Sequence, residues 1–204
     1  FYTEACMKGQ KELIECFRKN NSILRFAQIL RAGFHPDVLK SLEKNGRIGK
    51  ISRGIYSLND AAGVESDLVR AMLMAGKGVI CLVSALSYYE ATDEIPRHVD
   101  IAIRKGMWAN KIEFPPVKYY QFDPKQWEAG IEEHKIEGHT IRIYSLAKTV
   151  ADCFKFRSRI GTDAARAALK VAVIEKKVNA LDILKYAKIC RVAGIIKPLL
   201  EIII

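Results

Sequence analysis

The sequence predicts an α+β protein, in which an N-terminal winged helix-turn-helix precedes a larger mixed domain that ends in helices. Three observations support this prediction. Helical periodicity recurs three times within residues 1–46 and is followed by two short segments rich in β-branched residues. Strand-like segments are concentrated between residues 79 and 144, and a helical pattern dominates after residue 145. The chain has 204 residues, half of them hydrophobic, which suits two domains and allows a real core.

Two helices are predicted before residue 34. The first covers GQKELIECFRKN, residues 9–20, and the second covers ILRFAQILRAG, residues 23–33. Gly33 is expected to end the second helix as a left-handed cap residue. Their predicted apolar stripes are Leu13, Ile14 and Phe17 in the first helix and Phe26, Ala27 and Leu30 in the second.

A third helix and a hairpin complete the predicted N-terminal domain. The helix covers HPDVLKSLEKNG, residues 35–46, because Pro36 suits the first helical position. RIGKISRGIYSL, residues 47–58, favours two strands, and Gly54 can supply the positive φ of a tight turn. An irregularity is expected near Gly49, where alternation fails. Val38, Leu39 and Leu42 are expected to face inward, and Asp37, Lys40, Ser41 and Lys44 outward.

The order of these elements and their charge predict contact with double-stranded DNA. Residues 1–60 carry 11 Lys and Arg against 6 Asp and Glu, and residues 61–204 carry 22 against 17, so each segment has a net charge of +5. The shorter segment is therefore the more densely charged one, as expected for a domain that meets phosphates. The alternative is an ordinary solvated helix face. The candidate DNA-binding residues are Arg31, His35, Lys40, Ser41, Lys44, Arg47, Lys50 and Arg53.

A boundary between domains 1–60 and 61–204 is predicted in NDAAG, residues 59–63. After it we expect a helix in DLVRAMLMAG, a buried strand in VICLV, and a helix in SALSYYEA capped by Ser84. HVDIAIRKG and VKYYQFD favour strands, and IEEHKIEGHTIRIYS favours a hairpin that turns at Gly138. The remaining predicted helices are SLAKTVADCFKFRSR, TDAARAALKVAVIEKK, NALDILKYAKICR and IIKPLLEIII.

The segment SLAKTVADCFKFRSR, residues 145–159, has a predicted basic outer face. Ser145 suits the N-cap, and Leu146, Val150, Cys153 and Phe154 form the expected inner stripe. Lys148, Asp152, Lys155 and Arg159 share the other side, and Arg157 adds to its charge. This face suits docking to an acidic protein or to nucleic acid, although a solvated, salt-bridged face explains the same pattern.

Several other kinds of site are not predicted. His98 and Asp100 share a strand face, but a metal needs three or four converging ligands, so no metal and no cofactor are predicted. We find no phosphate-binding glycine loop and no nucleophile elbow, and Ser84 has no evident catalytic partner, so no catalytic residue is predicted. The five scattered cysteines suggest reduced thiols in a cytoplasmic protein, and no membrane span is expected.

The chain resembles the AbiEi-type antitoxins of type IV toxin–antitoxin systems, which act in abortive phage infection. Three stretches carry the resemblance: AGFHPDVLKSLEKNGRIGKISRGIYSL, VICLVSALSYYEATDEIPRHVDIAI and IRIYSLAKTVADCFKFRSRIG. The resemblance implies a winged helix that binds promoter repeats and represses its own operon. It also implies a C-terminal antitoxin domain that counteracts a nucleotidyltransferase-like toxin without a stable complex.

The resemblance implies two sets of contact residues and a choice of partners. Lys40, Ser41, Lys44, Lys50 and Arg53 match positions expected to meet DNA, and Lys148, Lys155, Arg157 and Arg159 are the candidate antitoxin surface. The expected partners are promoter DNA and a cognate toxin that is acted on indirectly or transiently, with the chain a monomer or weak dimer. The alternatives are a winged-helix protein–protein interaction module or a transcription regulator unrelated to a toxin.

Overall fold

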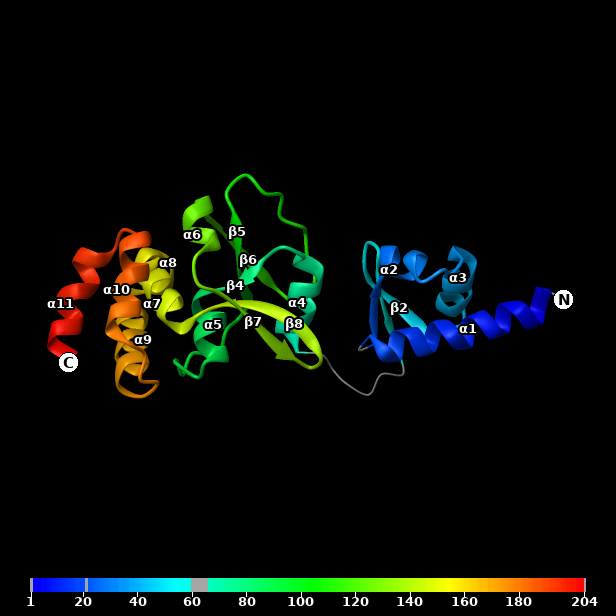
Figure 1. Ribbon diagram of the computed structural model, residues 1–204, viewed down its shortest axis with the longest axis horizontal. Helices are drawn as coiled ribbons and strands as arrows, with labels where there is room; N and C mark the ends of the chain where they lie inside the picture. Colours follow the sequence, from blue (N-terminus) through cyan, green and yellow to red (C-terminus); the bar gives the residue numbers. More distant parts are fainter. Residues whose placement is uncertain (1, 21, 60–65, 204) are drawn as a thin grey trace. The chain divides into compact units, whose positions relative to one another are not determined.

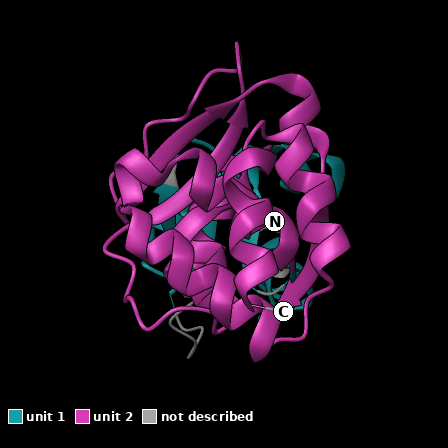
Figure 2. Cartoon of the chain, turned by 90° about the vertical axis from the view of Figure 1, so that its left-hand side faces the viewer, with its two compact units in different colours: residues 1–65, 137–139 teal, residues 66–136, 140–204 magenta. Residues whose placement is uncertain are grey.

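The computed structural model describes residues 2–20, 22–59 and 66–203, with side chains left out at 2–8 and 52. The fold class is α+β, as predicted, with helical segments at its C-terminal end. The chain forms two compact units, one of residues 1–65 with 137–139 and one of residues 66–136 with 140–204 (Figure 2). Residues 60–63 of the predicted boundary lie outside the described residues.

Unit 1 combines three helices with a three-stranded sheet (Figure 1). The strands lie in the order β1-β3-β2, and β3 pairs antiparallel with both neighbours. The core consists of Leu13, Phe17, Leu24, Ile29, Leu39, Leu42, Ile48 and Leu58. The elements are α1 (Tyr2–Lys19), β1 (Ile23–Arg25), α2 (Phe26–Arg31), α3 (Pro36–Lys44), β2 (Ile48–Ser52) and β3 (Ile55–Leu58). The winged-helix interpretation of this unit stays a prediction.

The segment before α3 differs from the prediction. Residues 23–25 form strand β1, with Leu24 opposite Tyr56, so the helix begins only at Phe26. Of its predicted apolar stripe, Phe26 packs against the core, but Ala27 is exposed, Leu30 is 45% exposed, and the buried residue is Ile29. The irregularity expected near Gly49 lies instead between Lys50 and Ser52.

Unit 2 is built on a five-stranded sheet with the order β6-β5-β4-β8-β7. The pairing is mixed, because β4 is antiparallel to β5 but parallel to β8, and β5 is parallel to β6. The strands are β4 (Val79–Ile80), β5 (Val99–Arg104), β6 (Val117–Phe122), β7 (Ile131–Ile136) and β8 (His139–Tyr144). The predicted turn at Gly138 joins β7 to β8, and this glycine has φ +79°.

Helices cover both faces of this sheet. They are α4 (Asp67–Ala75), α5 (Leu82–Tyr88), α6 (Pro124–Glu128), α7 (Leu146–Lys155), α8 (Arg157–Ile160), α9 (Thr162–Ile174), α10 (Ala180–Ile189) and α11 (Ala193–Ile203). Alternate residues of β5 enter two cores: Val99, Ile101 and Ile103 pack with α4, and Ala102 packs with α7, α9 and α10. In Figure 1 the helices α7–α11 gather on one side of the sheet. Among the described helices, none is long and apolar enough to cross a membrane.

Three boundaries in unit 2 differ from the prediction. Strand β4 ends at Ile80, and the chain turns through Cys81 and Leu82 into α5, so Ser84 lies inside the helix and does not cap it. The Cys81 N–H donates to the Asp100 carbonyl at 3.0 Å, which holds this turn against β5. The helix predicted over residues 145–159 breaks at Phe156 into α7 and α8.

Candidate functional site

Helix α3 presents two exposed lysines beside the core of unit 1. Pro36 occupies the first turn as predicted, and Leu39 and Leu42 are buried, which leaves Lys40 and Lys44 on the solvent side. The Lys40 ammonium lies 3.6 Å from the Asp37 carboxylate, an exposed pair that contributes little to stability. Both lysines are therefore available to a partner.

Ser41, predicted to face outward with these lysines, contacts another helix. Its hydroxyl accepts a hydrogen bond from the Gln10 side chain of α1 at 2.8 Å, and Ser41 is half-buried. The adjacent Gly9 of α1 approaches the same side of α3, because a Cβ at Gly9 would lie 3.5 Å from Val38. The periodicity of α3 alone did not show that α1 covers this side, so Ser41 is removed from the proposed DNA contacts.

His35 and two arginines lie around α3. His35 is its N-cap, and its Nδ1 accepts from the Asp37 N–H at 3.3 Å and lies 3.1 Å from the Asp37 carboxylate. This histidine therefore has a capping role beside any contact with a partner. Arg31 is exposed in the last turn of α2, and Arg47 is exposed between α3 and β2.

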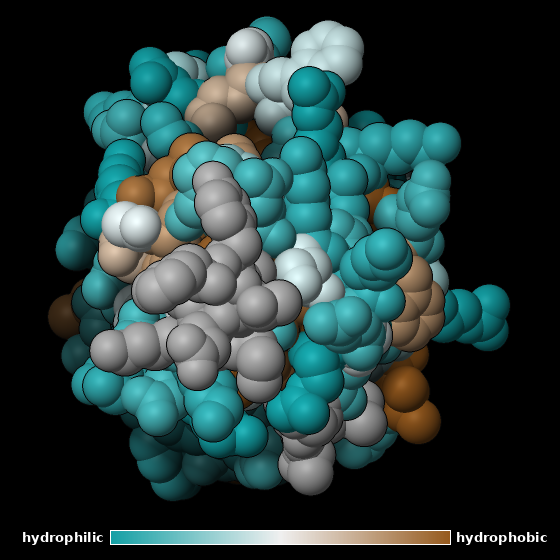
Figure 3. Space-filling view, turned by 90° about the vertical axis from the view of Figure 1, so that its right-hand side faces the viewer, coloured by the Kyte–Doolittle hydropathy of each residue, from teal (hydrophilic) through white to brown (hydrophobic). Residues whose placement is uncertain are grey.

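The hairpin of β2 and β3 carries two exposed cations, and a backbone hydrogen bond ties its turn to α2. Lys50 lies opposite Tyr56, and Arg53 with Gly54 forms the two-residue turn between Ser52 and Ile55. Gly54 adopts φ +74°, which a side chain rarely tolerates, so glycine is required there. The Phe26 N–H donates to the Gly54 carbonyl at 2.8 Å, and this bond ties the turn to the start of α2. Figure 3 shows mostly hydrophilic residues on the side where α1 and α3 lie.

The part of the predicted basic face that lies between residues 146 and 154 is buried. Lys148 has 0% of its side chain exposed, and its ammonium donates to both oxygens of Asp152 at 2.6 Å. Every residue of α7 from Leu146 to Phe154 is buried, because α5, α9 and α10 all pack against this helix. The assignment of Lys148 to the antitoxin surface is therefore wrong.

The other three residues of that prediction differ in their exposure and in their contacts. The half-buried Lys155 donates to the Gln126 side chain, and burial lowers the pKa of its ammonium. Arg157 is half-buried and donates to the Phe154 carbonyl at 2.8 Å. Arg159 is exposed, and its guanidinium lies over the Tyr120 and Phe156 rings at 5.9 and 5.7 Å from their centroids.

A polar cluster joins α5 to the start of β5. The Ser84 hydroxyl accepts from the Asp100 N–H at 2.9 Å and donates to the His98 carbonyl at 3.2 Å. The Ser84 N–H donates to Asp100 Oδ2 at 3.4 Å, and His98 Nε2 lies 3.0 Å from Asp100 Oδ1. Ser84 thus has the partners that the sequence did not indicate, but its hydroxyl contacts the His98 backbone and not the imidazole. This is not a nucleophile–base pair.

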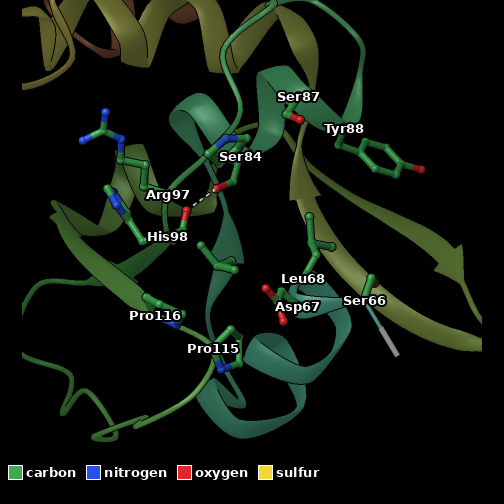
Figure 4. A pocket seen from close by; sticks show the side chains of 12 residues that line it. Ser66, Asp67, Leu68, Ser84, Ser87, Tyr88, Arg97, His98, Pro115 and Pro116 are labelled. Atoms are coloured by element: carbon green, nitrogen blue, oxygen red, sulfur yellow. Dashed lines mark hydrogen bonds between the residues drawn. The ribbon is translucent and has the colours of Figure 1, made fainter. Parts of the chain in front are cut away.

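Two cavities flank this cluster. The first, of about 300 Å³, lies among the residues drawn in Figure 4, where Arg97 and His98 extend away from Ser66, Asp67 and Ser87. Those two side chains also line the second cavity, of about 780 Å³, together with Asp100, Lys118, Tyr120 and Arg159. Among the described residues, no group of three or more His, Cys, Asp or Glu could hold a metal ion.

No protein-family model matches the chain, and no curated protein matches it either.

Proposed function

We propose that unit 1 binds double-stranded DNA through α3 and the β2–β3 hairpin. The observation that carries this proposal is that exposed Lys40 and Lys44 on a well-packed helix lie next in the chain to a tethered hairpin bearing exposed Lys50 and Arg53. A helix with polar side chains can enter the major groove, and cations on a hairpin can neutralise phosphates. Asp37 and Glu43 are the exposed acidic residues of α3.

The resemblance to AbiEi-type antitoxins suggests which DNA unit 1 binds and what unit 2 does. The DNA would be the promoter of the chain's own operon, and unit 2 would counteract a toxin encoded beside it. Growth rescue by co-expression with the neighbouring gene tests the second role. Because Lys148 is buried, only the more exposed cations of residues 145–159, Arg159 above all, belong in that test.

Fluorescence anisotropy with upstream DNA and a shuffled duplex, at several salt concentrations, tests the DNA proposal. Lys44→Ala with Arg53→Ala is expected to weaken binding at least about tenfold and to make the salt dependence shallower by about 2 in log–log slope. Lys125→Ala with Lys170→Ala removes two exposed lysines of unit 2 and is the charge-matched control. Unchanged affinity and slope in the first variant, or no binding at low salt, would refute the proposal.

A further inference from the structure

The 780 Å³ cavity of unit 2 has the size of a small-molecule site, and residues of β6, an edge strand of the sheet, line it. Strands β5 and β6, helices α5 and α8 and residues 93–98 line it. In the register of the parallel pair, Asp100 lies opposite Lys118 and Ala102 lies opposite Tyr120. Asp100, Lys118 and Tyr120 therefore project from the same face of the sheet into one space.

Three exposed cations surround this cavity: Arg97, Lys118 and Arg159. Among the residues that the structure describes, none of them forms an ion pair with a carboxylate. The rings that border Arg159 limit where its guanidinium can go, and the Lys118 ammonium lies 5.5 Å from the Tyr120 centroid. The exposed Asp93 and Glu94 also line the cavity, but neither lies within ion-pair distance of these cations. Cations that have no ion-pair partner suit a phosphate group.

The buried Asp100 carboxylate at the floor of the cavity requires a hydrogen-bond donor, whereas the cations require an anion. Asp100 is 2% exposed, and its Oδ2 accepts the Ser84 N–H. The Tyr120 hydroxyl is a further hydrogen-bond partner of this carboxyl group, and His98 Nε2 lies 3.0 Å from Oδ1, but no described residue donates a hydrogen bond to Oδ1 itself. A buried carboxylate oxygen that accepts no hydrogen bond is costly, so a ligand that offers an N–H or O–H group would stabilise it. Burial also raises the pKa of Asp100, against the influence of His98.

Apolar side chains complete the lining. Val83, Ile95 and Ile160 border the same space, and Ile95 is 90% exposed. Such residues can pack against a flat ring. Inorganic phosphate would satisfy the cations but would meet the Asp100 carboxylate, and an uncharged nucleoside would leave the cations without a partner.

We propose that this cavity binds a free nucleotide. Lys118 and Arg159 hold its phosphate, Asp100 accepts hydrogen bonds from a sugar hydroxyl or a base N–H, and Ile95 packs against the base. This site is separate from the DNA-binding residues of unit 1 and is tested without DNA, so either proposal can fail while the other holds.

Isothermal titration of the full chain with AMP, GMP, CMP and UMP tests the proposal, with guanosine and inorganic phosphate as partial ligands. At least one mononucleotide should bind saturably and more tightly than either partial ligand. Lys118→Gln and Arg159→Gln should each weaken it at least about tenfold, whereas Lys125→Gln, an exposed lysine that does not line the cavity, should not. Tryptophan fluorescence confirms that each variant is folded.

Asp100→Asn supplies the second readout, because this substitution should change the affinities for nucleotide and for inorganic phosphate in opposite directions. The variant should weaken nucleotide binding and strengthen the binding of inorganic phosphate, since it removes a negative charge beside the cations. Unit 2 destabilisation alone would weaken both. Three results would overturn the proposal: no saturable binding of any mononucleotide, equal affinity for inorganic phosphate, or tighter binding of a 5′-phosphorylated trinucleotide, which would assign the cavity to a nucleic-acid end.

Discussion

The Lys148 ammonium lies inside the core of unit 2, where a carboxylate and aromatic rings surround it. Asp152 binds it through both oxygens, and the Tyr144 and Phe122 ring centroids lie 4.2 and 4.9 Å from its Nζ. Asp152 also accepts from the Cys190 thiol at 3.2 Å. Burial raises the pKa of Asp152 while Lys148 opposes that shift, so the two charges depend on each other.

Asp152→Ala is expected to lower the unfolding free energy of unit 2 by about 3–5 kcal/mol, because the Lys148 charge would stay buried without a partner. Urea unfolding followed by tryptophan fluorescence measures this loss, since Trp108 and Trp127 are the two tryptophans and both lie in unit 2. The double variant Lys148→Met with Asp152→Leu removes both charges and should lose less. An equal or greater loss in the double variant would contradict this account of the pair.

At the scale of the element, the contacts of the first turn of α7 fix where this helix starts. The Ser145 hydroxyl accepts from the Lys148 N–H at 3.3 Å, and the Ser145 N–H donates to the Gly130 carbonyl at 2.8 Å. Gly130 has φ +73°, and a Cβ there would lie 2.7 Å from the Lys148 Cβ, so the chain before α7 approaches this turn closely. The cap and the glycine together fix where the buried helix starts.

Ser145→Ala is expected to lower the unfolding free energy by about 1 kcal/mol, because an N-terminal N–H of α7 loses its side-chain acceptor. The same urea titration measures it. Ser158→Ala, at an exposed position of α8, is the matched control and should change the free energy by less than about 0.5 kcal/mol. If both substitutions have the same effect, the cap does not contribute as described.

Prediction from the sequence succeeded for elements whose pattern is local. The Ser145 cap, the Pro36 start of α3 and the turn at Gly138 are confirmed. Prediction failed where contacts with segments distant in the sequence decide the structure or the burial of an element. Residues 23–25 have a helical pattern but pair with β3, and α7 has a polar stripe that other helices cover.

The two candidate sites also differ in whether a local sequence pattern could predict them. Lys40, Lys44, Lys50 and Arg53 could be placed on a surface from periodicity and turn chemistry alone. The cavity of unit 2 could not, because it depends on a parallel register that brings Asp100 beside Lys118 and on α8 bringing Arg159 to the same space. The spacing of these residues along the chain does not predict that the fold brings them together.

At the scale of the molecule, the hydrophobic cores belong to separate units. One cluster lies wholly in unit 1, and two lie in unit 2 on opposite faces of its sheet. Leu39 is buried in the first core and Leu169 in the largest core of unit 2. A cavity in one core should therefore leave the packing of the others intact.

Leu39→Ala is expected to destabilise unit 1 by about 2–5 kcal/mol while the tryptophan transition stays in place. Far-UV circular dichroism, which reports helices of both units, should detect the loss at lower urea. Leu169→Ala is the matched substitution in unit 2 and should move the tryptophan transition. A shift of that transition by Leu39→Ala as large as that of Leu169→Ala would show that the units unfold together.

The cysteines buried around α7 give the chain a defined chemical reactivity. Cys81, Cys153 and Cys190 are free and buried, and burial raises the pKa of each thiol, that of Cys190 to about 12. Only a thiolate attacks an oxidant or an alkylating reagent at a useful rate. Resistance of these three thiols to iodoacetamide therefore reports native packing around α7, and their modification marks the opening of unit 2.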